Sequence, residues 1–218
     1  MNPPSPPPNE PAAVPAGATL ILDAAAIDRA LRRIAHEIIE ANPDLTGVAL
    51  VGIPSRGVEI ARRLATHLAT FTGVAPFCGV IDVSMHRDDI HTRRHLWPVQ
   101  PTELPHDLTG KTIVLTDDVL FSGRTCRAAM DAISSFGRPA RIQYAALVDR
   151  GHRELPIRAD YVGKNLPTAH RERVFVRFAG VDGVPDSVWL DHRAPQPKRL
   201  SIRFPYQPAH LDSEKQSA

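Results

Sequence analysis

Residues 112–125 read Thr-Ile-Val-Leu-Thr-Asp-Asp-Val-Leu-Phe-Ser-Gly-Arg-Thr, and this stretch decides the fold. An apolar run that is typical of a buried strand leads into two acids, Asp117 and Asp118. A short glycine-containing turn follows, and we predict a helix over 125–136. Strand, turn and helix in this order form the repeating unit of a parallel α/β sheet, whose ligands bind where the strands end. The two acids therefore lie where such a fold places its site.

The same alternation of strands and helices runs through most of the chain. Asp23 stands where the first predicted helix needs an N-cap. The predicted fold class is α/β, with a mostly parallel central sheet flanked by helices. Neither GxGxxG nor GxxxxGK[ST] occurs, which excludes the usual dinucleotide-binding and P-loop proteins. We predict helices over 24–41 and 58–68, and strands over 19–22, 48–53, 77–85, 111–116, 140–148, 174–178 and 187–190.

The composition fits one globular domain. The chain has 218 residues, 43% of them apolar, and a formal charge of +2. Its apolar runs are far shorter than the roughly 20 residues of a membrane span, and the N-terminus lacks the pattern of a signal peptide. Two cysteines cannot build a disulfide framework, and neither lies in a CxxC motif. We therefore expect a cytoplasmic protein without a membrane partner.

Proline marks the ends of the domain. Eleven of the 21 prolines fall in residues 1–18 and 195–218, which lack hydrophobic periodicity. We predict a proline-rich flexible tail over 1–18, one domain over 19–194, and a proline-rich, basic C-terminal extension over 195–218. Each tail is either a solvated extension or a motif that binds a partner.

The turn after the two acids has the chemistry of a sugar-phosphate site. A helix N-terminus offers unpaired N–H groups and a positive dipole end to a phosphate. Gly123 lets the backbone approach closely, and the hydroxyls of Ser122 and Thr125 add donors. Carboxylates repel a phosphate, but they suit the hydroxyls of an attached sugar, or a magnesium ion with its waters. The pattern predicts that the turn binds a 5′-phosphate and that the acids bind the ribose.

Residues 115–125 resemble the phosphoribosyl-diphosphate (PRPP) motif of type I phosphoribosyltransferases. Segments 33–40, 51–58, 86–89 and 147–168 look like the PyrR family of pyrimidine-operon regulators and uracil phosphoribosyltransferases. The last segment, which begins Leu-Val-Asp-Arg-Gly-His-Arg-Glu-Leu-Pro, is the most specific of the four. The resemblance covers about residues 20–190, without the tails. It implies the type I phosphoribosyltransferase fold, with a mobile active-site loop over 86–104.

The resemblance also implies a reaction: uracil and PRPP give UMP and diphosphate, with Mg²⁺ as cofactor. The catalytic residues that it implies are Arg56, Arg87, Asp117 and Asp118. The two aspartates would hold Mg²⁺ through water and PRPP, and Arg87 would neutralise the diphosphate. The PRPP-binding residues that it implies are Ser55, Arg56, Gly57, Asp117, Asp118, Val119, Leu120, Phe121, Ser122, Gly123, Arg124 and Thr125.

RNA is a second partner that the resemblance implies. PyrR-like proteins bind a stem-loop in the leader of pyrimidine mRNA, more tightly with UMP, and they form homodimers or larger homo-oligomers. This chain is basic in a matching region, since residues 138–177 hold nine Lys or Arg and four Asp or Glu. Segregated positive charge favours a polyanionic partner. The RNA-binding residues that the resemblance implies are Arg32, Arg33, His36, His152, Arg153, Arg158 and Lys164.

Four departures from the family pattern bear on these expectations. Thr116 stands where an aliphatic residue is common, Arg32 stands where a threonine is usual, and Ser55 and Ser122 replace threonines. Two alternative functions also stay open. One is an RNA-binding regulator with little catalysis, and the other is a phosphoribosyltransferase for another base. Whether transcription attenuation or translation is controlled depends on the leader RNA.

Overall fold

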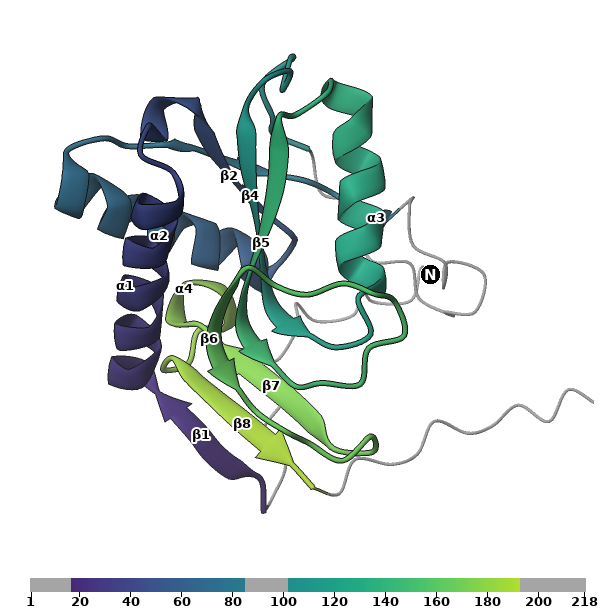
Figure 1. Cartoon of the computed structure of the whole chain (residues 1–218). Coiled ribbons are helices and arrows are strands. Elements are labelled where there is room, and N and C mark those ends of the chain that lie inside the picture. The colour runs from purple at the N-terminus through teal and green to yellow at the C-terminus, as the bar shows by residue number, and fades with distance from the viewer. Residues whose placement is uncertain (1–16, 85–101, 193–218) are drawn as a thin grey trace, which may run out of the picture.

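A computed structural model of the chain describes residues 17–84 and 102–192 (Figure 1). Most of the predicted active-site loop, including Arg87, lies outside the described residues. The predicted tails also lie outside them, apart from Gly17 and Ala18. Within the two described ranges, no helix has both the length and the apolar character that crossing a membrane requires.

The centre of the molecule is a five-stranded parallel sheet in the order β3-β2-β4-β5-β6. This confirms the predicted α/β class and the mostly parallel central sheet. Its strands are β2 (Val48–Gly52), β3 (Phe77–Val80), β4 (Thr112–Leu120), β5 (Arg141–Asp149) and β6 (Tyr161–Asn165).

Helices cover both faces of this sheet, with α1 and α2 on one side and α3 on the other (Figure 1). Successive side chains of a strand point to opposite faces. Leu50 and Val114 accordingly pack in the core beneath α1 and α2, whereas Val51 and Leu115 pack in the core beneath α3. The helices are α1 (Ala24–Ala41), α2 (Arg56–Thr72) and α3 (Arg124–Ile133), which continues in the 3₁₀ turn η3 (Ser134–Phe136).

The predicted N-cap of α1 is confirmed. A carboxylate oxygen of Asp23 accepts a hydrogen bond from the backbone N–H of Ala26 at 2.7 Å. The helix then buries Ile27, Leu31 and Ile34 along one stripe and leaves its basic face exposed.

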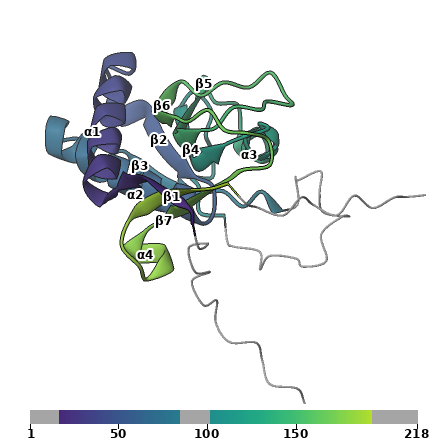
Figure 2. The same ribbon diagram turned by 90° about the horizontal axis from the view of Figure 1, so that it is seen from below.

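A second, antiparallel sheet lies beside the C-terminal ends of the central strands, in the order β1-β8-β7 (Figures 1 and 2). It joins the two ends of the described chain, because Thr19 in β1 is the register partner of Leu190 in β8. A short helix connects β7 to β8 and lies next to α2 in both views. The elements are β1 (Thr19–Asp23), β7 (Arg173–Arg177), α4 (Ala179–Asp182) and β8 (Ser187–Asp191).

Several predicted boundaries were wrong. The predicted strand over 77–85 ends at Val80, and α2 begins at Arg56, two residues before the prediction. Strand β4 continues past the acid pair, because Val119 and Leu120 still pair with Val148 and Asp149 of β5. The short elements β6 and α4 were not predicted at all.

Candidate functional site

Asp117 and Asp118 lie near the carboxyl end of β4, within the strand rather than after it. Asp117 is buried, and its Oδ1 accepts the backbone N–H of Asp118 at 2.9 Å. Its Oδ2 accepts the hydroxyl of Tyr144, on the neighbouring strand β5, at 3.2 Å. Asp118 is half-buried, and its Oδ1 accepts the N–H of Val119 at 2.9 Å. These contacts fix both carboxylates at the edge where parallel α/β sheets bind ligands.

The electrostatics of the pair favour a cationic or hydrogen-bond-donating ligand. Burial raises the pKa of Asp117 well above its ordinary value, and the neighbouring charge of Asp118 raises it further. Burial also raises the pKa of Asp118, whereas the positive charge of Arg56 opposes that rise. Two adjacent carboxylates, one buried and one half-buried, resist carrying two negative charges, and a cation or a set of hydroxyl donors relieves that cost.

Residues 121–123 join β4 to α3 and, with the first turn of α3, form what we call the phosphate loop. Gly123 has a φ of 91°, in the left-handed region, and a Cβ there would lie 3.3 Å from the Cβ of Ile157. The turn therefore requires glycine. It leaves the first N–H groups of α3 at the same edge of the sheet as the acid pair, as an anion site needs.

Residues 150–157, here called the strap, hold the phosphate loop in place. The carbonyl of Ser122 accepts the N–H groups of Glu154 and Leu155 at 3.0 and 3.1 Å. The Nε of Arg124 donates to Glu154 at 2.7 Å. The carbonyl of Phe121 accepts a guanidinium hydrogen of the strap at 2.8 Å. Both the backbone and the side chains of the loop are thus fastened to the strap.

That guanidinium belongs to Arg153, which is engaged inside the protein. It also donates to the carbonyl of Ile157 at 2.9 Å and pairs with Asp149. Its neighbour His152 contacts the carbonyl of Thr168 through Nε2 at 2.6 Å. These two predicted RNA-binding residues therefore have internal partners, whereas Arg158, just after the strap, is exposed.

The predicted loop Ser55–Gly57 lies directly beside the acid pair. A Cβ on Gly57 would lie 2.3 Å from the carbonyl oxygen of Thr116, so the two backbones are in contact. The buried hydroxyl of Thr116 donates to the carbonyl of Gly57 at 2.7 Å. The departure from the family pattern at Thr116 therefore ties β4 to this loop. The structure brings the two predicted groups of PRPP-binding residues together.

The guanidinium of Arg56, the first residue of α2, is held by a carboxylate of α4. Its Nε and Nη2 donate to the two carboxylate oxygens of Asp182, in α4, at 3.2 and 2.6 Å. Sequence reasoning missed both Asp182 and Tyr144. No local signal could have found them, since each contacts its partner across a long separation along the chain.

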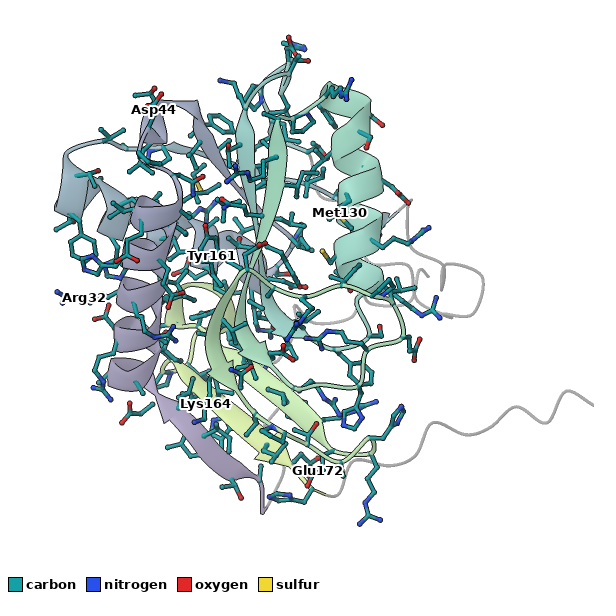
Figure 3. All side chains as sticks on the ribbon, in the orientation of Figure 1. Arg32, Asp44, Met130, Tyr161, Lys164 and Glu172 are labelled. Atoms are coloured by element: carbon teal, nitrogen blue, oxygen red, sulfur yellow. The ribbon has the colours of Figure 1, made fainter. Side chains whose placement is uncertain are left out.

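The other predicted RNA-binding residues gather around α1. Arg32 and His36 lie against Phe71 of α2: the imidazole stacks on the Phe71 ring at 4.3 Å, and the guanidinium carbon lies 5.7 Å from the ring centre. Arg33 reaches the other way and donates to the β6 carbonyls of residues 162 and 163 at 2.9 and 2.7 Å. That contact places Arg33 beside Lys164, and Figure 3 shows Arg32 on the outer side of α1 and Lys164 toward β8. We call Arg32, Arg33, His36 and Lys164 the α1–β6 face.

The donor set suits a magnesium ion that is held mainly by substrate and water. Among the described residues, no three His, Cys, Asp or Glu side chains cluster as a metal cage would require. Asp117 and Asp118 nevertheless supply adjacent carboxylates. Mg²⁺ is usually bound through one or two carboxylates together with waters and substrate phosphates, so these residues fit that ion.

Curated relatives match most of the chain. A "Bifunctional protein PyrR" of Chloroflexus aurantiacus is 58% identical over 170 residues, which cover 78% of this chain and 93% of the relative. Another, of Leifsonia xyli subsp. xyli, is 56% identical over 169 residues and covers 75% of this chain and 92% of the relative.

Solved structures show the same fold. A hypoxanthine phosphoribosyltransferase of Trypanosoma cruzi superposes with a TM-score of 0.62 at 17% identity, covering 79% of this chain and 90% of that one. A hypoxanthine-guanine phosphoribosyltransferase of Bacillus anthracis superposes with a TM-score of 0.56 at 16% identity, covering 75% and 89%. The family model of the phosphoribosyl transferase domain matches residues 17–177. The match to the family model and the identity to these relatives show that the chain belongs to the phosphoribosyltransferase family and, within it, to the bifunctional PyrR proteins.

Proposed function

We propose that this protein transfers the phosphoribosyl group of PRPP to uracil, giving UMP and diphosphate, and that it binds the leader mRNA of pyrimidine genes when UMP is bound. One observation carries the catalytic half. The acid pair, the phosphate loop and the loop Ser55–Gly57 lie together at one end of β4, as binding a sugar with a phosphate on each side requires.

Each part of the site has a role in this proposal. The phosphate loop binds the 5′-phosphate, and Asp117 and Asp118 accept hydrogen bonds from the ribose hydroxyls. Ser55 and Gly57 offer backbone groups to the diphosphate, and Arg56 neutralises its charge. The C1′–O bond breaks, and the diphosphate leaves with the electron pair. The uracil nitrogen bonds to C1′ and releases its proton to the departing diphosphate or to water. Catalysis then consists mainly of positioning and of stabilising the leaving group.

Magnesium completes the site when it is bound. Asp117 and Asp118 would hold it through water and PRPP, and the ion would supply charge neutralisation to the departing diphosphate. Burial raises the pKa of both carboxyls, and a nearby cation would offset the cost of burying their negative charge.

The test is an assay of the purified protein with PRPP, Mg²⁺ and a panel of bases. We expect release of diphosphate with uracil, and no turnover with hypoxanthine, guanine or adenine. Turnover with a purine instead would identify a phosphoribosyltransferase for another base. Nucleotide binding and RNA binding without any turnover would identify a regulator that uses the site as a sensor only.

For RNA, we propose that the α1–β6 face contacts the phosphates. It is built from two elements that Arg33 holds together, so its cations keep a fixed spacing. Phosphate contacts supply much of the affinity of such interfaces, and unpaired bases and shape supply the specificity. The imidazole rings of His36 and His67 stack on Phe71 and offer a flat surface at the edge of this face.

The strap gives a route by which UMP affects RNA binding. Its residues 153–155 are hydrogen-bonded to the phosphate loop, and the chain then leads through Arg158 to β6, which carries Lys164. A phosphate bound in the loop fixes the strap and therefore the position of these cations. Arg153, at the centre of the strap, is in this proposal a link rather than an RNA contact.

Changing Arg153 should therefore uncouple the two ligands. We expect R153Q to reduce the gain in RNA affinity caused by UMP to less than about twofold, with little change in affinity without UMP. R158Q, the matched control, should lower RNA affinity by about threefold, equally with and without UMP, because it removes one phosphate contact. Fluorescence anisotropy with leader RNA measures both. If R153Q behaves like R158Q, Arg153 is an RNA contact and not a link.

We also propose that the protein works in the cytoplasm and as a homo-oligomer. The two free thiols, Cys78 and Cys126, support a reducing compartment. Sedimentation velocity of the full-length chain measures the assembly.

A further inference from the structure

Two similar ion pairs join α2 to the segment after β7. Arg56 and Arg63 lie on α2, about two turns apart. Arg56 donates to both oxygens of Asp182 at 3.2 and 2.6 Å, and Arg63 donates to both oxygens of Asp186. Each aspartate also accepts a backbone N–H, from residues 178 and 179 respectively. Figure 2 shows α4, which ends at Asp182, close to α2 and β7.

Only the first of these pairs lies at the site. Arg56 belongs to the loop that contacts β4 beside the acid pair, and its charge is close enough to oppose the burial-driven rise in the pKa of Asp118. Arg63 instead lies over the ring of Phe178, 4.7 Å from its centre, and also pairs with Glu59. Arg56 therefore lies near the acid pair, whereas Arg63 packs between Phe178 and Glu59.

Asp182 is built to hold a cation in one orientation. Its side chain is 7% exposed, and both of its oxygens are occupied. Oδ1 accepts from Arg56 and, at 3.2 Å, from Arg177, while Oδ2 accepts from Arg56 and from the N–H of Phe178 at 2.9 Å. Bidentate arginine–carboxylate pairs fix the plane of the guanidinium. Arg56 is nevertheless 29% exposed, so a ligand can still reach it.

We propose that Asp182 is a positioning residue, which holds the guanidinium of Arg56 where the departing diphosphate gains its charge, whereas Asp186 serves only to fasten α4 to α2. This inference rests on the proposed function. A cation that is already in place needs no reorganisation during the reaction. A loose arginine would lose side-chain entropy each time it bound the diphosphate.

The test compares D182N with D186N in the full-length protein, with uracil, PRPP and Mg²⁺. Each change removes one carboxylate from a bidentate arginine pair and keeps the side-chain size. For D182N we expect the KM for PRPP and the inhibition constant of diphosphate to rise about tenfold, with the KM for uracil unchanged. D186N should change each value less than about twofold. D182E should restore most of the affinity for PRPP, because it returns a carboxylate.

Equal kinetics for D182N and D186N would overturn the proposal, and so would an equal rise in the KM values for uracil and PRPP in D182N. Arg177 is buried beside Asp182 and donates to it, so D182N alone weakens a buried ion pair and can impair folding. The double variant R177M D182N removes this second arginine together with the carboxylate and should show the same defect toward PRPP. If the wild-type protein does not turn over uracil, the proposed function fails instead. Calorimetric titration with Mg²⁺-diphosphate then still tests the positioning role, since D182N should bind about tenfold more weakly.

Discussion

Replacing Asp117 and Asp118 together by asparagine is expected to lower kcat/KM for PRPP about a thousandfold. Hydrogen bonds that involve a charged group contribute about 1.5–3 kcal/mol each, and the change weakens those to the ribose and removes the carboxylates that would hold Mg²⁺. Steady-state assays with uracil measure the loss. D131N, which alters an exposed aspartate on α3, is the control and should leave turnover unchanged. An active double variant would refute the site.

The same double variant is expected to be more stable than the wild type, by about 3 °C in Tm at neutral pH without ligands. Burial raises the folded-state pKa of Asp117 and of Asp118 above their unfolded values. When folding raises the pKa of a carboxyl, the protein becomes less stable as the pH rises from the unfolded-state pKa through the folded-state pKa. Asparagine does not ionise, so the variant lacks that loss. Thermal melts from pH 4 to 8 in EDTA measure it, and an inactive variant that melts earlier would mean damage to the fold.

Removing three cations from the α1–β6 face, as R32A R33A K164A, is expected to weaken leader-RNA binding about a hundredfold, with uracil turnover unchanged. A plot of log affinity against log salt concentration falls with a slope of about 0.7 per phosphate contact. Losing three contacts should therefore make this slope shallower by about 2. Anisotropy titrations between about 50 and 200 mM salt measure both quantities.

The control for this variant is K111A R138A R141A. It removes the same number of charges from the end of the central sheet where β4 and β5 begin, whereas Lys164 lies beside Val148 near the other end of β5. Its RNA affinity should fall less than about threefold. Equal loss in the two triple variants would mean that net charge matters and placement does not. Loss of uracil turnover in R32A R33A K164A would mean that α1 no longer packs correctly against β6.

The site was largely predictable where it is local in the sequence. Strand β4, the turn at Gly123 and α3 follow one another within residues 112–133, so their spacing alone predicts two acids beside a helix N-terminus. The contact between Gly57 and Thr116 was predictable only through the family resemblance. Periodicity identifies a strand, but it does not say which strand lies beside it.

The elements that sequence reasoning missed depend on tertiary contacts. Strand β6 is short, with a glycine and a lysine, and it lies at the edge of the sheet, where Arg33 bonds to its backbone. Helix α4 has only four residues and is held by the ion pairs to α2. Tyr144 reaches Asp117 only because β5 pairs with β4 in one particular register.

The sequence count of basic residues overstates the charge that faces solvent. Among the nine Lys or Arg in residues 138–177, Arg150 and Arg177 are buried, and Arg153 is bonded to three backbone carbonyls and to Asp149. Arginine carries a fork of donors that suits internal carbonyls as well as phosphates. Counting charges along the chain cannot separate these two uses, and the structure does.

The pairing of β1 with β8 has a consequence for engineering. Thr19 and Leu190 lie opposite each other, and the Thr19 hydroxyl contacts His192 at 3.1 Å, so the chain enters and leaves the domain at neighbouring points (Figure 1). A short peptide that joined these points would leave both sheets intact. New ends could then open at the exposed turn of Thr109 and Gly110. The domain is thereby suited to circular permutation, or to transplantation as a unit into a surface loop of a host protein.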